Sequence, residues 1–209
     1  MALKPYRTLL KAASDEFIVN KSRFIGYGQP CETEEEALAF LSDIRARHKD
    51  ASHNCYAYII GPNMGVMRYS DDGEPGGTAG MPIIEVLKAR SVTNCAVVVT
   101  RYFGGVLLGT GGLVRAYTQS TQAGIDAAQL VVVSRCVDLR IRIAYPRYEQ
   151  LMRLAEDHGA KVLSTDFADA VTMNLRMLDG TQQPLLDALT ARERGQEDVE
   201  VGDPIDAAF

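Results

Sequence analysis

Two glycine-rich segments hold most of the residues whose types and spacing could support chemistry. Residues 70–80 read Ser-Asp-Asp-Gly-Glu-Pro-Gly-Gly-Thr-Ala-Gly, and residues 104–112 read Gly-Gly-Val-Leu-Leu-Gly-Thr-Gly-Gly. Each segment runs into a predicted helix, and a helix N-terminus carries about half a positive charge together with unpaired backbone N–H groups. The two segments therefore predict a binding site for an anion, while tight turns and close helix–sheet packing are the other use for such glycines.

The first segment also carries three acidic side chains, Asp71, Asp72 and Glu74. Carboxylates at this spacing could ligate Mg²⁺ or act as a general acid and base. The same Asp-Asp-Gly-Glu-Pro string is typical of a solvent-exposed turn. Turn chemistry is the favoured interpretation and no metal is assigned, but the metal stays an alternative if the two segments meet in one cleft.

Three arginines, Arg68, Arg101 and Arg115, lie on or beside these segments. Their guanidinium groups could donate charge-assisted hydrogen bonds to a phosphate or carboxylate, or could be solvated or paired with acidic side chains. The predicted anion- or ligand-binding residues are Arg68, Asp71, Asp72, Glu74, Gly77, Thr78, Gly80, Arg101, Gly104, Gly105, Gly109, Gly111, Gly112 and Arg115.

Neither segment spells a recognised nucleotide-binding motif, since no Gly-Lys-Ser/Thr follows the glycines. Nucleotide hydrolysis is therefore not indicated, and no cofactor is predicted. His53 and Cys55 share one face of a predicted strand and could form a Cys–His nucleophile. A packed Cys55 and a hydrogen-bonded His53 are favoured over catalysis.

The elements that position these segments form two predicted domains, residues 1–136 and 137–209, of an α+β protein. A capping box at Thr33 and Glu36 marks the start of a helix, and Pro82 suits the first turn of another. The first domain is expected to hold strands within 6–31, a helix over 33–48, a hairpin of 53–60 and 66–69, a short helix opening at Pro82, a central strand over 94–103, a helix over 113–128 and a closing strand over 130–136.

The second domain is expected in the order strand, helix, strand, strand, helix, strand, which is that of a ferredoxin-like split unit. The expected positions are 139–143, 148–158, 161–167, 170–177, 184–194 and 199–201. Residues 202–209 are expected to be frayed, as chain ends often are.

Composition narrows the class of protein. The chain has 209 residues, 46% of them apolar, which is ordinary for a globular protein. No apolar run approaches the roughly 18 residues that span a bilayer, and the first residues hold no signal-peptide core, so a cytoplasmic protein without membrane contact is predicted. The four cysteines form no Cys-x-x-Cys pair and are read as reduced thiols.

The net charge of −5 is unevenly divided along the chain. Residues 1–137 carry 14 basic and 13 acidic side chains, whereas residues 138–209 carry 8 and 14. Proteins that neutralise many phosphates of a duplex usually show a large basic face, and this composition offers none. Any contact with nucleic acid is therefore expected to be local.

The glycine-rich segments also carry a family resemblance. Residues 70–82 and residues 100–117 resemble the signature of the IMPACT family in its bacterial YigZ-type form, and the strings His-Asn-Cys-Tyr-Ala-Tyr at 53–58 and Ser-Arg-Phe-Ile-Gly at 22–26 also match. The likeness is strong over about residues 1–130 and extends over nearly the whole chain. This chain departs from the family at Leu107, where many members have lysine, and at Gly76, where a residue such as serine is found.

The resemblance implies an N-terminal domain like the second domain of a ribosomal small-subunit protein, a shape shared with RNase PH and GHMP kinases. It implies a C-terminal domain like domain V of elongation factor G. Eukaryotic relatives are linked to control of translation initiation, but they carry a different accessory domain, so that partner does not transfer to this chain.

Two main hypotheses of function follow. In the first, the glycine-rich loops recognise an anionic partner, RNA or a translation-associated protein, in a regulatory role. In the second, the protein is an enzyme acting on a phosphorylated or carboxylated small molecule, with an acidic residue of the first loop as base and Arg101 or Arg115 holding the anion. A binding protein is favoured over an enzyme, with protein–protein docking through the second domain as a third possibility.

Overall fold

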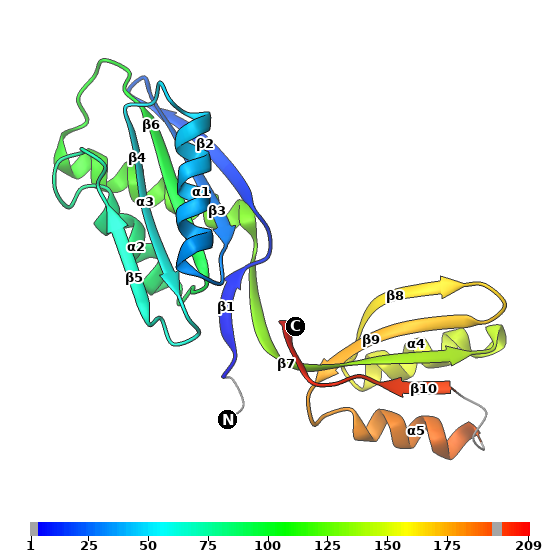
Figure 1. Ribbon diagram of the computed structural model, residues 1–209. Coiled ribbons are helices and arrows are strands. Elements are labelled where there is room, and N and C mark those ends of the chain that lie inside the picture. The colour runs from blue at the N-terminus through cyan, green and yellow to red at the C-terminus, as the bar shows by residue number, and fades with distance from the viewer. Residues whose placement is uncertain (1–3, 194–197) are drawn as a thin grey trace. The chain divides into compact units, whose positions relative to one another are not determined.

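The computed structural model describes residues 4–193 and 198–209 of the chain. Contacts separate two compact units, Tyr6–Val132 and a second unit made mainly of Val133–Phe209. Each is a mixed α/β structure with antiparallel sheet pairing, as the α+β prediction requires (Figure 1). Across the described ranges, no helix is both long and apolar enough to cross a membrane.

The first unit is built on a five-stranded sheet in the order β2-β3-β6-β4-β5, with every neighbouring pair antiparallel. Helix α1 covers one face of this sheet, and α2 and α3 cover the other (Figure 1). The elements of the unit are β1 (Tyr6–Leu9), β2 (Ala13–Val19), β3 (Ser22–Pro30), α1 (Glu34–Arg47), β4 (His53–Ile60), β5 (Val66–Ser70), α2 (Gly80–Ala89), β6 (Cys95–Tyr102) and α3 (Gly109–Ala128).

Strand β6 lies at the centre of this sheet and is buried on both faces. Val97 and Val99 belong to the apolar cluster under α2 and α3, whereas Ala96 and Val98 belong to the cluster under α1. This alternation follows the two-residue period of a strand. The prediction of a central strand is confirmed. Because Arg101 follows Val99 by two residues, its side chain lies on the same face of the sheet, toward α2 and α3.

The register of the sheet decides which side chains meet near the end of β6. Arg101 lies opposite His53 of β4 on one side and opposite Phe24 of β3 on the other. Directly opposed residues of antiparallel strands point to the same face of the sheet. His53 and Arg101 therefore both face α3, although they are far apart in the sequence.

The second unit follows the predicted succession of elements. Its strands pair in the antiparallel order β10-β7-β9-β8, and an apolar cluster fills the space between this sheet and helices α4 and α5. The elements are β7 (Leu130–Ile143), the 3-10 turn η1 (Tyr145–Arg147), α4 (Tyr148–Asp157), β8 (Lys161–Phe167), β9 (Val171–Leu178), α5 (Gln183–Glu193), β10 (Asp198–Val201) and β11 (Ile205–Ala208). The expected end of the second helix at Arg194 lies outside the described residues.

Two expectations for this part of the chain are wrong. The strands expected over 130–136 and 139–143 are one continuous strand, β7, because no glycine or proline interrupts the β-branched run between them. The tail is not frayed either, since β11 pairs with β7 and places Ile205 opposite Cys136. The backbone N–H and C=O groups of β7 pair with those of β11, and the composition of the tail does not reveal this pairing.

Helix α3 begins earlier than the sequence suggests. It starts at Gly109, not Leu113, so the last glycines of the second segment form its first turn. Glycine is a poor helix former, which hides this start from propensity arguments. Gly109 has a φ of 67°, a conformation that glycine adopts readily where the chain turns into the helix.

Helix α3 approaches strand β3 closely through two glycines. A Cβ atom at Gly26 would lie 2.0 Å from the carbonyl oxygen of Ser120, and one at Gly124 would lie 2.8 Å from the backbone of Gly26. Neither position has room for a side chain. The absence of these side chains therefore sets the distance between α3 and the sheet.

We expect Gly26→Ala to lower the free energy of unfolding by about 2 to 3 kcal/mol, because the added methyl group forces α3 away from the sheet. Urea denaturation followed by circular dichroism measures the change. Gly65→Ala is the matched control, since a Cβ there meets nothing within 4 Å, and it should change stability by less than about 0.5 kcal/mol. Equal effects of the two substitutions would contradict this account of the packing.

Candidate functional site

The two glycine-rich loops meet beside the end of β6 and enclose a pocket of about 480 Å³. One loop connects β5 to α2 and the other connects β6 to α3. The pocket is lined by Ser52, His53, Gly73, Glu74, Pro75, Arg101, Phe103, Leu107, Leu108, Gly109, Thr110 and Leu113. This concave surface is the candidate functional site.

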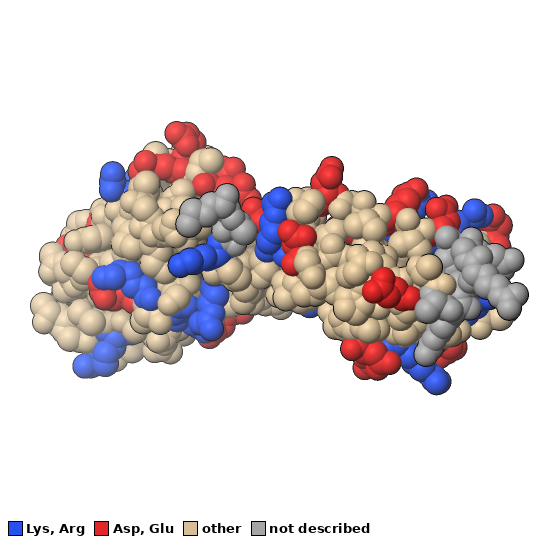
Figure 2. Space-filling view, turned by 90° about the horizontal axis from the view of Figure 1, so that it is seen from below, with Lys and Arg blue, Asp and Glu red and all other residues tan. Residues whose placement is uncertain are grey.

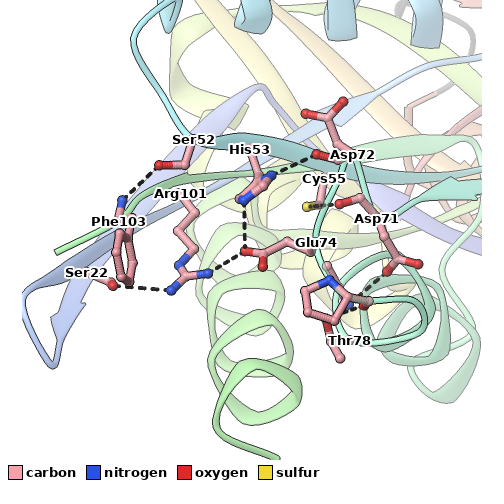
Figure 3. A network of polar contacts seen from close by, with 12 residues as sticks. Ser22, Ser52, His53, Cys55, Asp71, Asp72, Glu74, Thr78, Arg101 and Phe103 are labelled. Atoms are coloured by element: carbon pink, nitrogen blue, oxygen red, sulfur yellow. Dashed lines mark hydrogen bonds and ion pairs between the residues drawn. The ribbon is translucent and has the colours of Figure 1, made fainter. Parts of the chain in front are cut away.

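A buried ion pair between Glu74 and Arg101 lies at one side of this pocket. Nη1 of Arg101 donates to Oε1 of Glu74 at 2.6 Å, and the two side chains are only 3% and 6% exposed. The Tyr117 hydroxyl of α3 donates to the same oxygen at 2.7 Å. Glu74 therefore links its loop to both β6 and α3, and Figure 3 shows its contact with Arg101.

The remaining groups of Arg101 are less completely satisfied. Nη2 lies 3.5 Å from the Ser22 hydroxyl, at the outer limit of a hydrogen bond. The Nε–H group is buried and has no hydrogen-bond partner within the described residues. Arg101 is thus not a free surface cation awaiting an anion, as the sequence alone would allow, but a buried residue paired with Glu74.

His53 extends the same network toward the pocket. Its Nδ1 lies 2.8 Å from the backbone carbonyl oxygen of Asp72, and its Nε2 lies 3.9 Å from Oε1 of Glu74 (Figure 3). A carbonyl oxygen only accepts hydrogen bonds, so Nδ1 must carry a hydrogen. In the neutral ring, Nε2 is then an acceptor, and it faces a carboxylate that is also an acceptor.

Asp71 has a structural role at the start of α2. Its carboxylate accepts hydrogen bonds from the backbone N–H groups of Gly77, Ala79 and Gly80, at 2.8 to 3.0 Å. Partial burial alone would raise the pKa of Asp71, but these three hydrogen bonds outweigh it and hold the pKa below its ordinary value. The anion site predicted at the start of α2 is therefore filled by the chain's own carboxylate.

Asp72 is likewise used within the fold. Its two oxygens accept from Arg45 of α1 at 2.7 Å and from the backbone N–H of Asn54 at 2.6 Å. The three acidic residues of the loop thus bind three different sets of partners. Across the residues described, no group of three or more His, Cys, Asp or Glu side chains is arranged to hold a metal ion.

The start of α3 differs from that of α2. The N-cap residue Leu108 provides no side-chain hydrogen bond, and the first turn contains no acidic residue, in the part of the chain described. Gly109 and Thr110 of this first turn line the pocket. A Cβ at Gly111 would lie 3.7 Å from Nη1 of Arg115, so that guanidinium group folds back beside the same turn. The backbone N–H groups at the start of α3 are the pocket's available anion donors.

Apolar side chains form much of the pocket lining. Phe103, Leu107, Leu108 and Leu113 line it together with Pro75. Phe103 and Leu107 are exposed, and the 85% exposure of Leu107 is unusual for a leucine, whereas Leu113 is buried. The site therefore combines polar groups with apolar side chains, as small-molecule sites commonly do.

The position of Cys55 disfavours nucleophilic chemistry. It is fully buried, and its thiol donates to the carbonyl oxygen of Asp71 at 2.9 Å. Burial raises the pKa of Cys55 to about 12, so the reactive thiolate is scarce at neutral pH. The preference for a packed Cys55 agrees with this geometry.

The structure brings some predicted residues to the pocket and leaves others away from it. Glu74, Arg101 and Gly109 line it, whereas Arg68 lies on the edge strand β5 with its side chain 61% exposed, near Glu34. The other predicted positions shape the loops. Gly104 packs against the backbone of Lys21, the Thr78 hydroxyl donates to the Pro75 carbonyl, and Gly77, Gly105 and Gly109 have positive φ angles.

His53, Ser52 and Thr110 line the pocket but are absent from the predicted site. His53 reaches it because β4 and β6 place it opposite Arg101, a register that no local pattern reveals. The signals in the sequence are the place of His53 beside Cys55 on one face of a predicted strand and its presence in a string shared with the family.

The fold and the pocket define a class of two-unit α+β proteins in which two loops form the pocket. Comparison with known proteins identifies the family. Residues 20–125 match the Impact N-terminal domain, and residues 141–196 match a domain of unknown function, DUF1949. The chain therefore belongs to the IMPACT family, in its bacterial YigZ-type form.

Individual relatives support this assignment over most of the chain. A Haemophilus influenzae IMPACT family member is 33% identical over 85% of this chain and 87% of its own length. Escherichia coli YigZ is 32% identical over 76% and 79%, and Bacillus subtilis YvyE is 48% identical over 59% and 57%. A crystal structure titled as that of a hypothetical protein covers 95% of this chain and 97% of its own, with a TM-score of 0.61 and 28% identity.

Asp71→Asn should lower the free energy of unfolding at neutral pH by about 0.5 to 2 kcal/mol, the usual value of a helix N-cap. Because the folded-state pKa of Asp71 is depressed, its contribution is present above about pH 4, the ordinary pKa of Asp, and is lost as the pH falls through the lower folded value. The gap between wild type and variant should therefore close in acid.

Urea denaturation at a series of pH values measures this gap. Asp43→Asn is the control, because the helix pair between Asp43 and Arg47 is exposed, and this substitution should change the free energy of unfolding by less than about 0.5 kcal/mol. A gap for Asp71→Asn that is independent of pH would contradict the assigned role of the carboxylate.

Glu74→Gln should lower the free energy of unfolding by about 3 to 5 kcal/mol, because it leaves the Arg101 charge buried without compensation. Adding Arg101→Met removes that charge and should recover part of the loss, which a double-mutant cycle measures as coupling. Glu16→Gln provides the comparison, since the Glu16–Arg23 pair is about half exposed and should contribute less than about 1 kcal/mol. Purely additive effects of the Glu74 and Arg101 substitutions would rule out the pair as a structural unit.

Proposed function

We propose that this protein binds its partner through an anionic group held in the pocket at the start of α3. The single observation that carries the proposal is the difference between the two helix starts. The N-terminus of α2 is filled by Asp71, whereas that of α3 faces a pocket containing the buried Arg101. A helix terminus and its free N–H groups favour an anion there.

The surface charge supports a local contact in preference to an extended one. On the face drawn in Figure 2, Lys and Arg lie among Asp and Glu, and neither sign covers a broad area. A helix terminus contributes about 0.3 to 2 kcal/mol and a charged hydrogen bond about 1.5 to 3 kcal/mol. Added together, these values correspond to dissociation constants from tens of millimolar to about a few tenths of a millimolar for an isolated anion.

The family resemblance suggests the setting of this contact. We propose a cytoplasmic, translation-associated regulatory role in which the anion belongs to RNA or a ribosome-linked factor. The proposed domains are an IMPACT-type unit over 1–136, like the second domain of a ribosomal small-subunit protein, and a ferredoxin-like unit over 137–209, like domain V of elongation factor G. The continuous antiparallel order β10-β7-β9-β8 supports the second likeness.

An enzyme acting on a phosphorylated or carboxylated small molecule is the second candidate. His53 favours it, because its hydrogen bond to the Asp72 carbonyl fixes the ring and presents Nε2 beside Glu74 in the pocket. Such a fixed imidazole is suited to proton transfer. Turnover of a bound phosphate ester would distinguish this candidate from simple binding.

Thr110 offers a substitution that changes the pocket without disturbing the core, since it is exposed and lies in the first turn of α3. Thr110→Asp should weaken anion binding at least about tenfold, because the new carboxylate competes for the helix N-terminus. Thr110→Asn has the same size without the charge and should remain within about threefold of wild type.

Binding is measured by the rise in unfolding midpoint with nucleoside monophosphates, sugar phosphates and short single-stranded RNAs, since a ligand of the native state stabilises it. For RNA, contact with one phosphate predicts a shallow salt dependence, with a logarithmic slope of about −0.7. If none of these anions stabilises wild type, or if both Thr110 variants behave alike, the proposal is wrong.

A further inference from the structure

We infer that the pocket selects a phosphate monoester, an anion that still carries a proton, over phosphodiesters, sulfate and carboxylates. This inference rests on the proposed function and names the ligand class of the same site. It follows from the position of hydrogen-bond donors and acceptors on the two sides of the pocket.

The donors lie at the start of α3. Gly109 and Thr110 line the pocket, their helix turn has no acidic side chain, and its cap residue Leu108 makes no side-chain hydrogen bond among the described residues. A negatively charged oxygen is favoured at this end of the pocket.

The acceptors are contributed by β4 and the first loop. Nε2 of His53 is an acceptor in the neutral ring, because Nδ1 donates to the Asp72 carbonyl. Glu74 also lines the pocket, and both hydrogen bonds that it receives within the described residues reach Oε1. Nε2 of His53 and Oε2 of Glu74 receive no hydrogen bond among the described residues, so a hydrogen donated by a ligand would satisfy either acceptor.

A ligand that fits both sides must be anionic and also able to donate a hydrogen. A phosphate monoester meets this requirement, because its second pKa is about 6 and one oxygen is protonated for part of the time near neutral pH. A phosphodiester, a sulfate and a carboxylate have no such hydrogen at that pH. An acceptor left unpaired by those ligands would be costly, which is how sites built around hydrogen bonds reject close analogues.

Arg101 is a second, independent sign that the site is built for a ligand. It is 5% exposed and lines the pocket, yet its Nε–H has no hydrogen-bond partner in the described part of the chain. Buried polar groups normally have partners, and the few exceptions tend to occur at functional sites. The charge of Arg101 also offsets that of Glu74, so the acceptor side does not repel a phosphate strongly.

The exposed apolar side chains of the pocket account for the ester group. Phe103 and Leu107 line the pocket and are open to solvent. The carbon attached to the ester oxygen can contact these side chains while the phosphate lies against α3. A small phosphorylated metabolite and the phosphorylated end of a polynucleotide share this chemistry.

The test titrates the full chain with methyl phosphate, dimethyl phosphate and sulfate at about pH 7, where the monoester is still protonated for part of the time and imidazole is ordinarily neutral, following backbone amide NMR signals of the α3 first turn. Methyl phosphate should bind at least about tenfold tighter than the other two probes, the value of one hydrogen bond to a charged group. Thr110→Asp should weaken all binding at this site.

His53→Asn and His53→Gln separate the acceptor from the structural role of the ring. Asn can replace the Nδ1 hydrogen bond to Asp72 but has no group at the position of Nε2, whereas the longer Gln can present an amide oxygen there. We expect the preference for methyl phosphate to be lost in His53→Asn and to be retained in part by His53→Gln. If both variants keep the full preference for methyl phosphate, the assignment of His53 is wrong.

The outcomes distinguish this inference from the proposed function. Sulfate or dimethyl phosphate binding as tightly as methyl phosphate, with loss in Thr110→Asp, would overturn the monoester assignment and leave the anion site intact. Absence of binding by all three probes would remove both. A 5′-phosphorylated oligonucleotide that binds more tightly than methyl phosphate, with its 5′-hydroxyl form inactive, would assign the monoester to a polynucleotide end, and equal affinity would assign it to a small molecule.

Discussion

The buried carboxylate of Glu74 is the constraint on which the candidate site depends. It accepts hydrogen bonds from Arg101 of β6 and Tyr117 of α3, and it lies 3.9 Å from His53 of β4. One residue of an irregular loop therefore joins three separate elements. A charge placed in the interior is tolerated only when it is paired and hydrogen-bonded, so the loop is held in the conformation that meets these requirements.

The other acidic residues of the loop explain why only one helix start is available. Asp71 binds the N–H groups at the start of α2, and Asp72 binds Arg45 and a strand amide. Both carboxylates are consumed in shaping the loop. The first turn of α3 has no acidic side chain and its cap residue makes no side-chain hydrogen bond in the part of the chain described, so its positive end is turned toward the pocket without a carboxylate capping it.

Local patterns predict most elements of the fold and little of the site's geometry. A continuous apolar run identifies β6, and the glycine-rich segments correctly indicate where two loops enter helices. The sequence cannot show that Arg101 is buried against Glu74, because that pairing depends on sheet register and loop closure. The same holds for β11, whose partner lies about 70 residues earlier in the chain.

The roles of charged residues are ambiguous in sequence for a physical reason. The string around Asp71 fits a turn, a metal site or a helix cap equally well, since all three use carboxylate oxygens against nearby donors. The three uses differ in which donors the rest of the fold places beside the carboxylate. Here backbone N–H groups donate to Asp71 and an arginine pairs with Glu74, whereas Nε2 of His53 faces the pocket. An acidic chain can therefore bind an anion, because selectivity depends on groups within a few ångströms and opposing charges beyond roughly 10 Å are screened.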